Sequence, residues 1–150
     1  MREYHPVNFH YRVEFLDLPG RTPEDIKFQS VTGLSVDFNT DSFKEGGENR
    51  FEHIVPARTK YPELVLKRGL YLPGKSGLTD WCNKAFDNFI FQPVNLNVQL
   101  LNENHETLVQ WKVVHAWPKS WEFGELNAED GKILIETFKL NYNYFRYRKP

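Results

Sequence analysis

Cysteine is nearly absent from this chain, which has one such residue, Cys82, among 150. A single thiol cannot form an intramolecular disulfide, and no Cys/His cluster has the spacing of zinc ligands. We therefore expect the chain to fold in a reducing compartment. A chain of this length buries a stable core without disulfides or metals, so we expect one domain over residues 1–150.

An excess of charge of either sign is also missing. Lys and Arg number 19 against 20 for Asp and Glu, which gives a formal net charge of -1. Such a balance creates no field that attracts nucleic acid or an anionic membrane, so sequence-specific nucleic acid binding is not expected. It also leaves little long-range repulsion between copies of the chain, which permits self-association.

Long apolar runs are absent as well. No stretch approaches the roughly 18 apolar residues of a membrane span, and residues 1–9 interleave polar and apolar side chains where a signal peptide has an apolar run. We expect the protein to be made and assembled in the cytoplasm without a signal peptide, and to make no integral membrane contact.

Sequence motifs for catalysis or cofactor binding are missing too. The five histidines, at positions 5, 10, 53, 105 and 115, do not form the close pairs that present two metal ligands on one face. No G-x-S-x-G elbow is present, and Gly46-Gly47 is too short to cradle a phosphate. A Ser/His/Asp triad meets only in space, so the sequence does not exclude one. We expect no enzyme, no catalytic residue, no cofactor and no metal.

Alternation of apolar and polar residues is the main pattern that is present. A period of two predicts strands with one buried face. The segments with this pattern, or with strand-forming residues bounded by turns, are 9–15, 26–38, 62–69, 94–100, 108–114, 117–123 and 133–144. The polar, glycine-bearing residues 39–50 predict a long loop or hairpin arm.

One segment has helical spacing. Apolar residues recur at i, i+3, i+4, i+7 and i+8 from Leu78, which predicts a helix over about residues 77–91 that lies across a sheet. Ser76 is a plausible N-cap, and Pro93 prevents continuation. Many strands with one helix predict a mainly β fold: an antiparallel β-sandwich or barrel with one flanking α-helix and a long polar hairpin arm.

Residues 58–69 read RTKYPELVLKRG, a stretch that closely resembles a signature of the phage tail-tube and contractile-injection inner-tube family. Further matches follow in order along the chain: FHYRVE from position 9, SVTGL from 30, EGG from 45, AWPKSW from 116, LNA from 126 and ILIET from 133. The long turn at residues 16–25 and the basic, aromatic end at residues 141–150 depart from the pattern.

The resemblance implies a structural, non-enzymatic protomer that assembles into hexameric rings, which stack into a hollow tube inside a contractile sheath. Its expected partners are other copies of the chain, sheath and baseplate proteins, and cargo or DNA in the lumen. The expected place of action is a phage tail within the virion, or a released extracellular injection particle that translocates cargo.

Several side chains are candidates for these contacts. The polar arm is expected to reach an adjacent ring, and basic residues around the signature are expected to pair with a neighbouring protomer. The candidates for inter-ring or inter-protomer contacts are Lys44, Glu45, Gly46, Gly47, Arg58, Lys60, Lys67 and Arg68. Alternation alone suggests that Asn95, Asn97 and Gln99 face the lumen.

Competing interpretations remain at this point. The arm could be an ordinary surface loop, and the basic residues ordinary solvated charges. Within the family, the chain could be a tube initiator near the baseplate or a type VI secretion ring protein. From a different class, the same strand pattern also fits a small-ligand-binding β-barrel with an apolar pocket.

Overall fold

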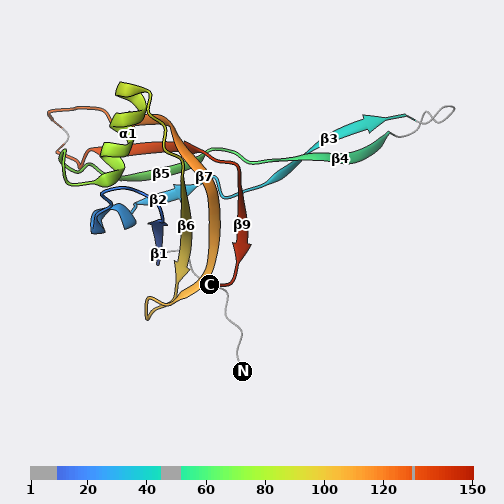
Figure 1. Ribbon diagram of the computed structural model, residues 1–150, viewed down its shortest axis with the longest axis horizontal. Coiled ribbons are helices and arrows are strands. Elements are labelled where there is room, and N and C mark those ends of the chain that lie inside the picture. The colour runs from blue at the N-terminus through green and yellow to red at the C-terminus, as the bar shows by residue number, and fades with distance from the viewer. Residues whose placement is uncertain (1–9, 45–51, 130) are drawn as a thin grey trace.

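The computed structural model describes residues 10–44, 52–129 and 131–150. Figure 1 shows a β-rich body with one helix and a long two-stranded arm that extends away from it. The strands are β1 (Tyr11–Phe15), β2 (Ser30–Thr32), β3 (Asp37–Phe43), β4 (His53–Lys60), β5 (Leu64–Gly69), β6 (Val94–Leu101), β7 (Thr107–Phe123), β8 (Ile135–Asn141) and β9 (Tyr144–Arg148). The helices are α1 (Gly77–Asn88) and a short 3-10 turn, η1 (Pro23–Ile26).

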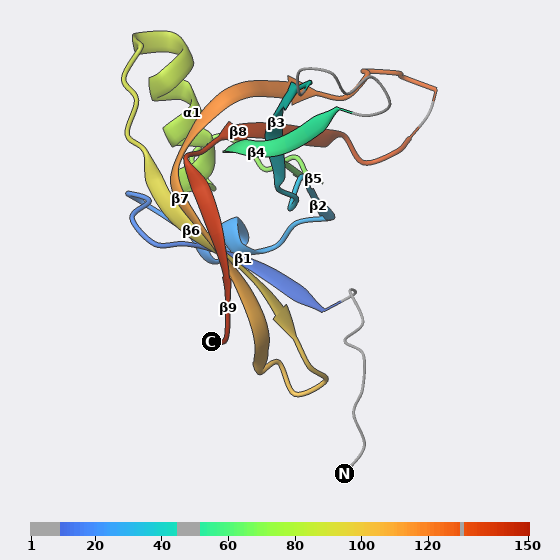
Figure 2. The ribbon, with the colours of Figure 1, turned by 90° about the vertical axis from the view of Figure 1, so that its right-hand side faces the viewer.

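The long strand β7 connects two layers of antiparallel strands. Its first part pairs with β6 and β9, and its last part, from Trp117, pairs with β8. The first layer therefore has the order β1-β6-β7-β9, and the second layer has the order β7-β8-β5-β2. Figures 1 and 2 show the strands of the two layers running across one another.

Local irregularities bend the sheet where β7 passes from one layer to the other. Register shifts occur between Val94 and Leu96 on β6 and between Pro118 and Ser120 on β7. His115, on β7 between these points, has a positive φ of 63°. Such bulges bend a strand and increase its twist, which lets one sheet fold over its own core.

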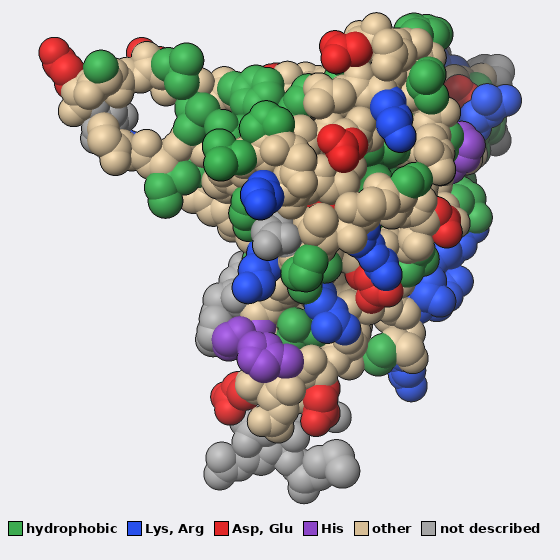
Figure 3. Space-filling model, turned by 60° about the vertical axis from the view of Figure 1, so that its left-hand side comes forward, with side chains coloured by type: hydrophobic (Ala, Val, Ile, Leu, Met, Phe, Trp, Pro, Cys, Tyr) green, Lys and Arg blue, Asp and Glu red, His purple; other side chains and the backbone are tan. Residues whose placement is uncertain are grey.

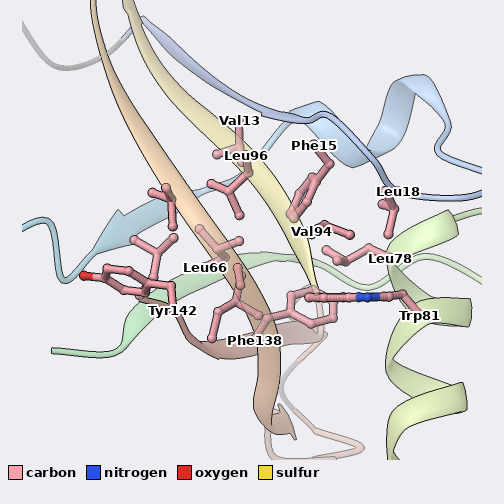
Figure 4. Close-up of a cluster of buried hydrophobic side chains, with 14 of the residues drawn as sticks. Val13, Phe15, Leu18, Leu66, Leu78, Trp81, Val94, Leu96, Phe138 and Tyr142 are labelled. Atoms are coloured by element: carbon pink, nitrogen blue, oxygen red, sulfur yellow. The ribbon is translucent and has the colours of Figure 1, made fainter. Parts of the chain in front are cut away.

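The hydrophobic core lies between the two layers and under α1. Val13 and Leu96 from the first layer, Leu66 and Phe138 from the second, and Trp81 from the helix are all buried in it. Figure 4 shows these side chains converging from their separate elements. Their burial supplies most of the free energy that holds the layers together.

Helix α1 begins as the sequence predicts and ends sooner. The Ser76 hydroxyl accepts a hydrogen bond from the Thr79 backbone N–H at 3.3 Å, as an N-cap does. The helix ends at Asn88 because Phe89 adopts a left-handed conformation, with φ 55°. The predicted apolar face therefore continues in sequence through Phe89 and Ile90, but these two side chains are exposed.

The predicted fold class is confirmed: over residues 10–44, 52–129 and 131–150 the structure is mainly antiparallel β, not a closed barrel, with one α-helix. The predicted hairpin arm is present as the paired strands β3 and β4, and it is longer than the predicted residues 39–50. Other predicted strands have different boundaries. The strand at 26–38 is split into η1, β2 and the start of β3, the strands at 108–114 and 117–123 form the single strand β7, and the final strand is split into β8 and β9. The basic end of the chain thus forms part of a sheet.

Candidate functional site

The arm formed by β3 and β4 has few contacts with the body. The two strands pair with each other and with no third strand among the residues that the structure describes. Their side chains are exposed, except for the half-buried His53, and they include Phe38, Phe43 and Ile54, of which Ile54 is 69% exposed. A lone hairpin is marginally stable in water, and exposed apolar side chains on it indicate a surface that binds another protein.

Gly33 fixes the base of this arm. Its φ is 98°, and a Cβ at this position would lie 2.0 Å from the carbonyl oxygen of Glu63. Only glycine fits this conformation and this close approach. The glycine of the SVTGL motif therefore determines where the chain leaves the body to form the arm.

A second apolar surface lies around the end of α1, and we call it the helix-end surface: Phe86, Phe89, Phe91, Trp117 and Phe123. Phe89 is 83% exposed, and its ring packs edge-on against Phe91, which packs against Trp117. An open hollow of about 510 Å³ lies here. Figure 3 shows further hydrophobic side chains along the projecting loop between β7 and β8.

The outward face of the first layer is polar. Arg12 Nε donates to Gln99 Oε1 at 2.5 Å, and Gln99 Nε2 donates to Gln110 Oε1 at 3.2 Å, so a ladder of side chains runs across three strands. Arg148 on β9 pairs with Gln110 and extends this row to the fourth strand. The opposite face of the same strands packs into the core.

The first layer ends in two edge strands, β1 and β9. Neither pairs with a further strand among the described residues. On β9, the carbonyl of Tyr147 accepts a hydrogen bond from its neighbour Arg148 Nη1 at 2.9 Å. Unpaired edges are templates for pairing with another chain, so β1 and β9 are candidate contact surfaces.

Arg68 lies at the centre of a buried ionic cluster. Its side chain is 2% exposed, and its guanidinium donates to Glu136 Oε2 and to Asp25 Oδ1, both at 3.0 Å. It also donates to Ser76 Oγ at 2.8 Å, and Trp121 Nε1 donates to the other Glu136 oxygen at 2.8 Å. The cluster connects β5, β8, η1 and the start of α1 within one chain.

Asp25 is ionised within this cluster. Burial alone would raise its pKa, but hydrogen bonds from the Ser76 hydroxyl, the Thr22 N–H, Arg68 and the Gly77 N–H together lower it. The carboxylate thereby accepts from the first backbone N–H of α1, where the helix dipole favours a negative charge. The contacts of the Asp25 carboxylate with Arg68 and with the N-terminus of α1 thus position the helix over the sheet.

The predicted contact residues lie in different environments. Lys44, Arg58 and Lys60 are exposed on the arm, and Lys67 is exposed on β5. Arg68 has its hydrogen-bonding partners inside its own chain. Glu45, Gly46 and Gly47 lie outside the described residues.

The predicted lumen residues share one face of β6, as the alternation indicated. Asn95 is exposed, Asn97 is half-buried, and Gln99 is buried within the polar ladder. Their orientation toward a lumen stays a prediction. Sequence reasoning did not find the edge role of β9 or the helix-end surface, although the basic, aromatic residues 145–150 and the exposed end of the helical pattern were visible signals.

No group of three or more His, Cys, Asp and Glu side chains among the described residues is placed to hold a metal ion. In the same part of the chain, no helix is long and apolar enough to cross a membrane. Burial raises the pKa of the Cys82 thiol, which keeps it protonated in the core.

Comparisons with known proteins identify relatives over nearly the whole chain. The family model described as T4-like virus tail tube protein gp19 matches residues 7–146. A chain in the cryo-EM structure of the anti-feeding prophage (AFP) baseplate, 6-fold symmetrised, is 30% identical, with a TM-score of 0.89 and coverage of 99% of this chain and 98% of that one. The sequence has no significant match among curated proteins.

Two further structures extend the comparison. A chain in the PVC sheath-tube complex of an extracellular contractile injection system, in the extended state, is 25% identical, with a TM-score of 0.82 and coverage of 99% of this chain and 94% of that one. Hcp1 from Flavobacterium johnsoniae is 13% identical, with a TM-score of 0.51 and coverage of 95% and 97%, and shares the fold alone.

Proposed function

We propose, from the premise that this chain belongs to the family of T4-like virus tail tube proteins gp19, that its copies close into six-membered rings that stack into a hollow tube. Membership confirms the predicted structural tube role and the predicted absence of enzymatic activity. The ring of six is supported by the sixfold symmetry of the AFP baseplate structure.

The observation that carries the ring is that the two edge strands of the first layer, β1 and β9, pair with no further strand among the described residues. Its four strands alternate in direction, so β9 runs antiparallel to β1 of the same chain. A neighbour placed beside β9 with its own β1 therefore forms an antiparallel pair, and repetition of this head-to-tail contact closes a continuous barrel. Closure removes both exposed edges.

A charged pair fixes the register of this junction. Glu14 on β1 lies in one cross-strand row with Arg146 on β9, and Arg148 lies one row away. When these rows continue across the junction, Glu14 of one copy comes within reach of Arg146 and Arg148 of its neighbour. Among the described residues, Glu14 has no ion pair within its own chain, which leaves it available for this contact.

Stacking uses the arm and the helix-end surface. The arm and α1, whose end carries the helix-end surface, lie toward opposite ends of the long axis of the molecule (Figure 1). Two unlike surfaces at opposite ends suit a head-to-tail contact that repeats without closing, as a tube requires. Because β3 and β4 extend well beyond the body, the arm is the part suited to reach a copy in the next ring.

Charge reversal at the junction tests the ring. Glu14→Arg should prevent ring formation, and Glu14→Arg combined with Arg146→Glu and Arg148→Glu should restore it, because every copy supplies both sides of the contact. Analytical ultracentrifugation reports the size of the assemblies. If Glu14→Arg forms rings as readily as the unchanged chain, this junction is wrong; Lys84→Glu on the outer face of α1 is the control for surface charge.

The remaining partners follow from the tube. The PVC relative comes from a sheath-tube complex and the AFP relative from a baseplate, so the matching partners of this chain are sheath and baseplate proteins. The AFP match makes a baseplate-proximal initiator the second candidate role. The place of action is a phage tail or a released injection particle.

A further inference from the structure

The outward face of the first layer is basic as well as polar. It is built from two cross-strand rows of side chains, defined by strand register: Arg12, Gln99, Gln110 and Arg148 in one, and Glu14, Asn97, Lys112 and Arg146 in the other. Side chains in one row and in rows two residues apart project from the same face. Four cations thus share this face with one carboxylate.

The positive charge is concentrated here and not spread over the molecule. Four cations and one carboxylate give this face a net charge of about +3. The whole chain carries a formal charge of -1, so its remainder carries about -4. The face and the rest of the surface therefore have opposite signs, which the overall charge balance conceals.

The charges of the four cations are not neutralised by the residues that the structure describes. None of them forms an ion pair among the described residues. The contacts that they do make are with neutral groups: Arg12 with the Gln99 amide, Arg148 with a backbone carbonyl, and Arg146 with the ring of Tyr144, 4.2 Å from its guanidinium carbon. In the proposed ring, Glu14 of the neighbouring copy balances one charge on Arg146 and Arg148, and a net charge of about +3 per copy is left available to a partner.

We propose that this face binds acidic protein cargo inside the tube. The inference rests on the proposed function: a ring closed through β1 and β9, with the second layer and its core on the outside, turns the polar face of the first layer inward. Each copy then contributes the same cations to one enclosed space, where like charges focus the potential. Between the cations lie the neutral amides of Asn95 and Asn97, which form hydrogen bonds with cargo but do not hold it by charge.

A folded acidic protein fits this surface better than duplex DNA does. DNA carries one negative charge per about 1.7 Å of its axis, and neutralising a run of phosphates releases counterions and binds strongly. Rings of cations repeated along a lumen would hold such a polyanion in place. An acidic protein has a lower density of charge, so it is attracted and still released.

The test measures charge selectivity with defined probes. The probes are two fluorescein-labelled peptides of equal length, a Glu-Ser repeat and a Lys-Ser repeat, and a short DNA duplex. Fluorescence anisotropy measures their binding to the dispersed full chain, whose basic face is exposed, and co-sedimentation measures their retention by assembled tubes. The acidic peptide should bind about tenfold more tightly than the basic one, and the difference should disappear at high salt.

Matched variants locate the effect. Asn95→Asp with Lys112→Glu adds three negative charges on interior strands of the face, away from the ring junction, and should weaken binding of the acidic peptide about tenfold. Lys75→Glu with Gln92→Glu adds the same charge outside the face and should change binding little. Circular dichroism checks folding; Lys112→Gln replaces the first variant if that variant does not fold.

Equal binding of the two peptides, or an equal loss of binding in both variants, would overturn the proposal. The tubes could also retain DNA at low salt and release it at physiological salt as readily as they release the acidic peptide. That result would assign the lumen to nucleic acid instead. A chain that binds the acidic peptide but forms no rings contradicts the proposed ring and leaves the binding result intact. Rings that form but show no charge selectivity contradict the proposed cargo binding and leave the proposed ring intact.

Discussion

At the scale of single residues, the buried cluster around Arg68 shows that a sequence signature can serve the fold of the protomer. Arg68 belongs to the RTKYPELVLKRG stretch and Glu136 to the ILIET stretch, and the two side chains form an ion pair at 3.0 Å inside the body. The neighbouring Lys67 points to solvent. Adjacent basic residues of one motif therefore have different roles.

Replacing Arg68 should destabilise the protomer itself. Arg68→Met leaves Asp25 and Glu136 buried without their cation, and removal of one member of a buried ion pair costs about 3–5 kcal/mol of unfolding free energy. Lys67→Met, one residue away and exposed, should cost less than about 1 kcal/mol. Urea unfolding of the dispersed chain measures both. Unchanged stability together with lost assembly would instead make Arg68 an interface residue.

The cluster also predicts how stability depends on pH. The pKa of Asp25 is lower in the folded chain than in the unfolded chain, so its contribution is present above the unfolded value of about 4 and is lost as pH falls through the folded pKa. Unfolding free energy should therefore decrease on acidification below about pH 4.

The substitution Asp25→Asn tests this dependence. The variant should be less stable at pH 7 and should show a shallower decrease in unfolding free energy on acidification than the unchanged chain. Asp41→Asn, which alters an exposed carboxylate on the arm, is the control and should behave like the unchanged chain. A variant Asp25→Asn with an unaltered acid limb would show that other carboxylates cause the decrease.

At the scale of elements, the arm is a two-stranded ribbon of marginal stability, which a partner that covers it would stabilise. Phe43 and Ile54 are exposed on the paired strands, and no side chain of β3 or β4 among the described residues is fully buried. Phe43→Ser with Ile54→Thr should leave the protomer fold and the rings intact and should abolish tubes. Negative-stain electron microscopy distinguishes rings from tubes.

Leu72→Ser is the matched control for the arm variant. Leu72 is 71% exposed and lies on the connector between β5 and α1, so its replacement removes a comparable apolar group outside the arm. This control should form tubes. Tubes of normal length from the arm variant would show that β3 and β4 do not stack the rings.

The sequence predicted the elements whose signals are local. The alternation at Tyr11–Phe15 and the helical spacing from Leu78 each follow from residues close in the chain, and both elements are present. A loop or hairpin arm was predicted at residues 39–50, but not that its paired strands extend from Asp37 to Lys60, because nearly all side chains of β3 and β4 are exposed and give no alternation. The break at Tyr142–Asn143 separates β8, which pairs with the last part of β7, from β9, which pairs with an earlier part of β7. Its position therefore depends on tertiary structure.

The candidate site was less predictable than the fold. Alternation placed Asn95, Asn97 and Gln99 on one face, but it could not show that β1 and β9 bring cations to the same face. Arg12 on β1 lies more than a hundred positions in sequence from Arg146 and Arg148 on β9. Their proximity is a property of sheet order, which no local pattern encodes.

At the scale of the whole molecule, three features point to one design. The edges β1 and β9, which pair with no further strand among the described residues, the arm at one end and the helix-end surface at the other all leave surfaces that a partner can cover. We propose that another copy covers each of them in a head-to-tail arrangement, laterally in the ring and axially in the tube. The activity of the protein is then the shape and the inner surface of the assembly.

Cryo-electron microscopy of the assembled protein, at a resolution that traces strands, tests this design most directly. We predict rings of six copies in which β9 of each copy pairs antiparallel with β1 of the next, with Lys112 facing the lumen. A chain that stays dispersed at high concentration even with its sheath and baseplate partners, or rings in which β1 and β9 remain unpaired, would contradict it.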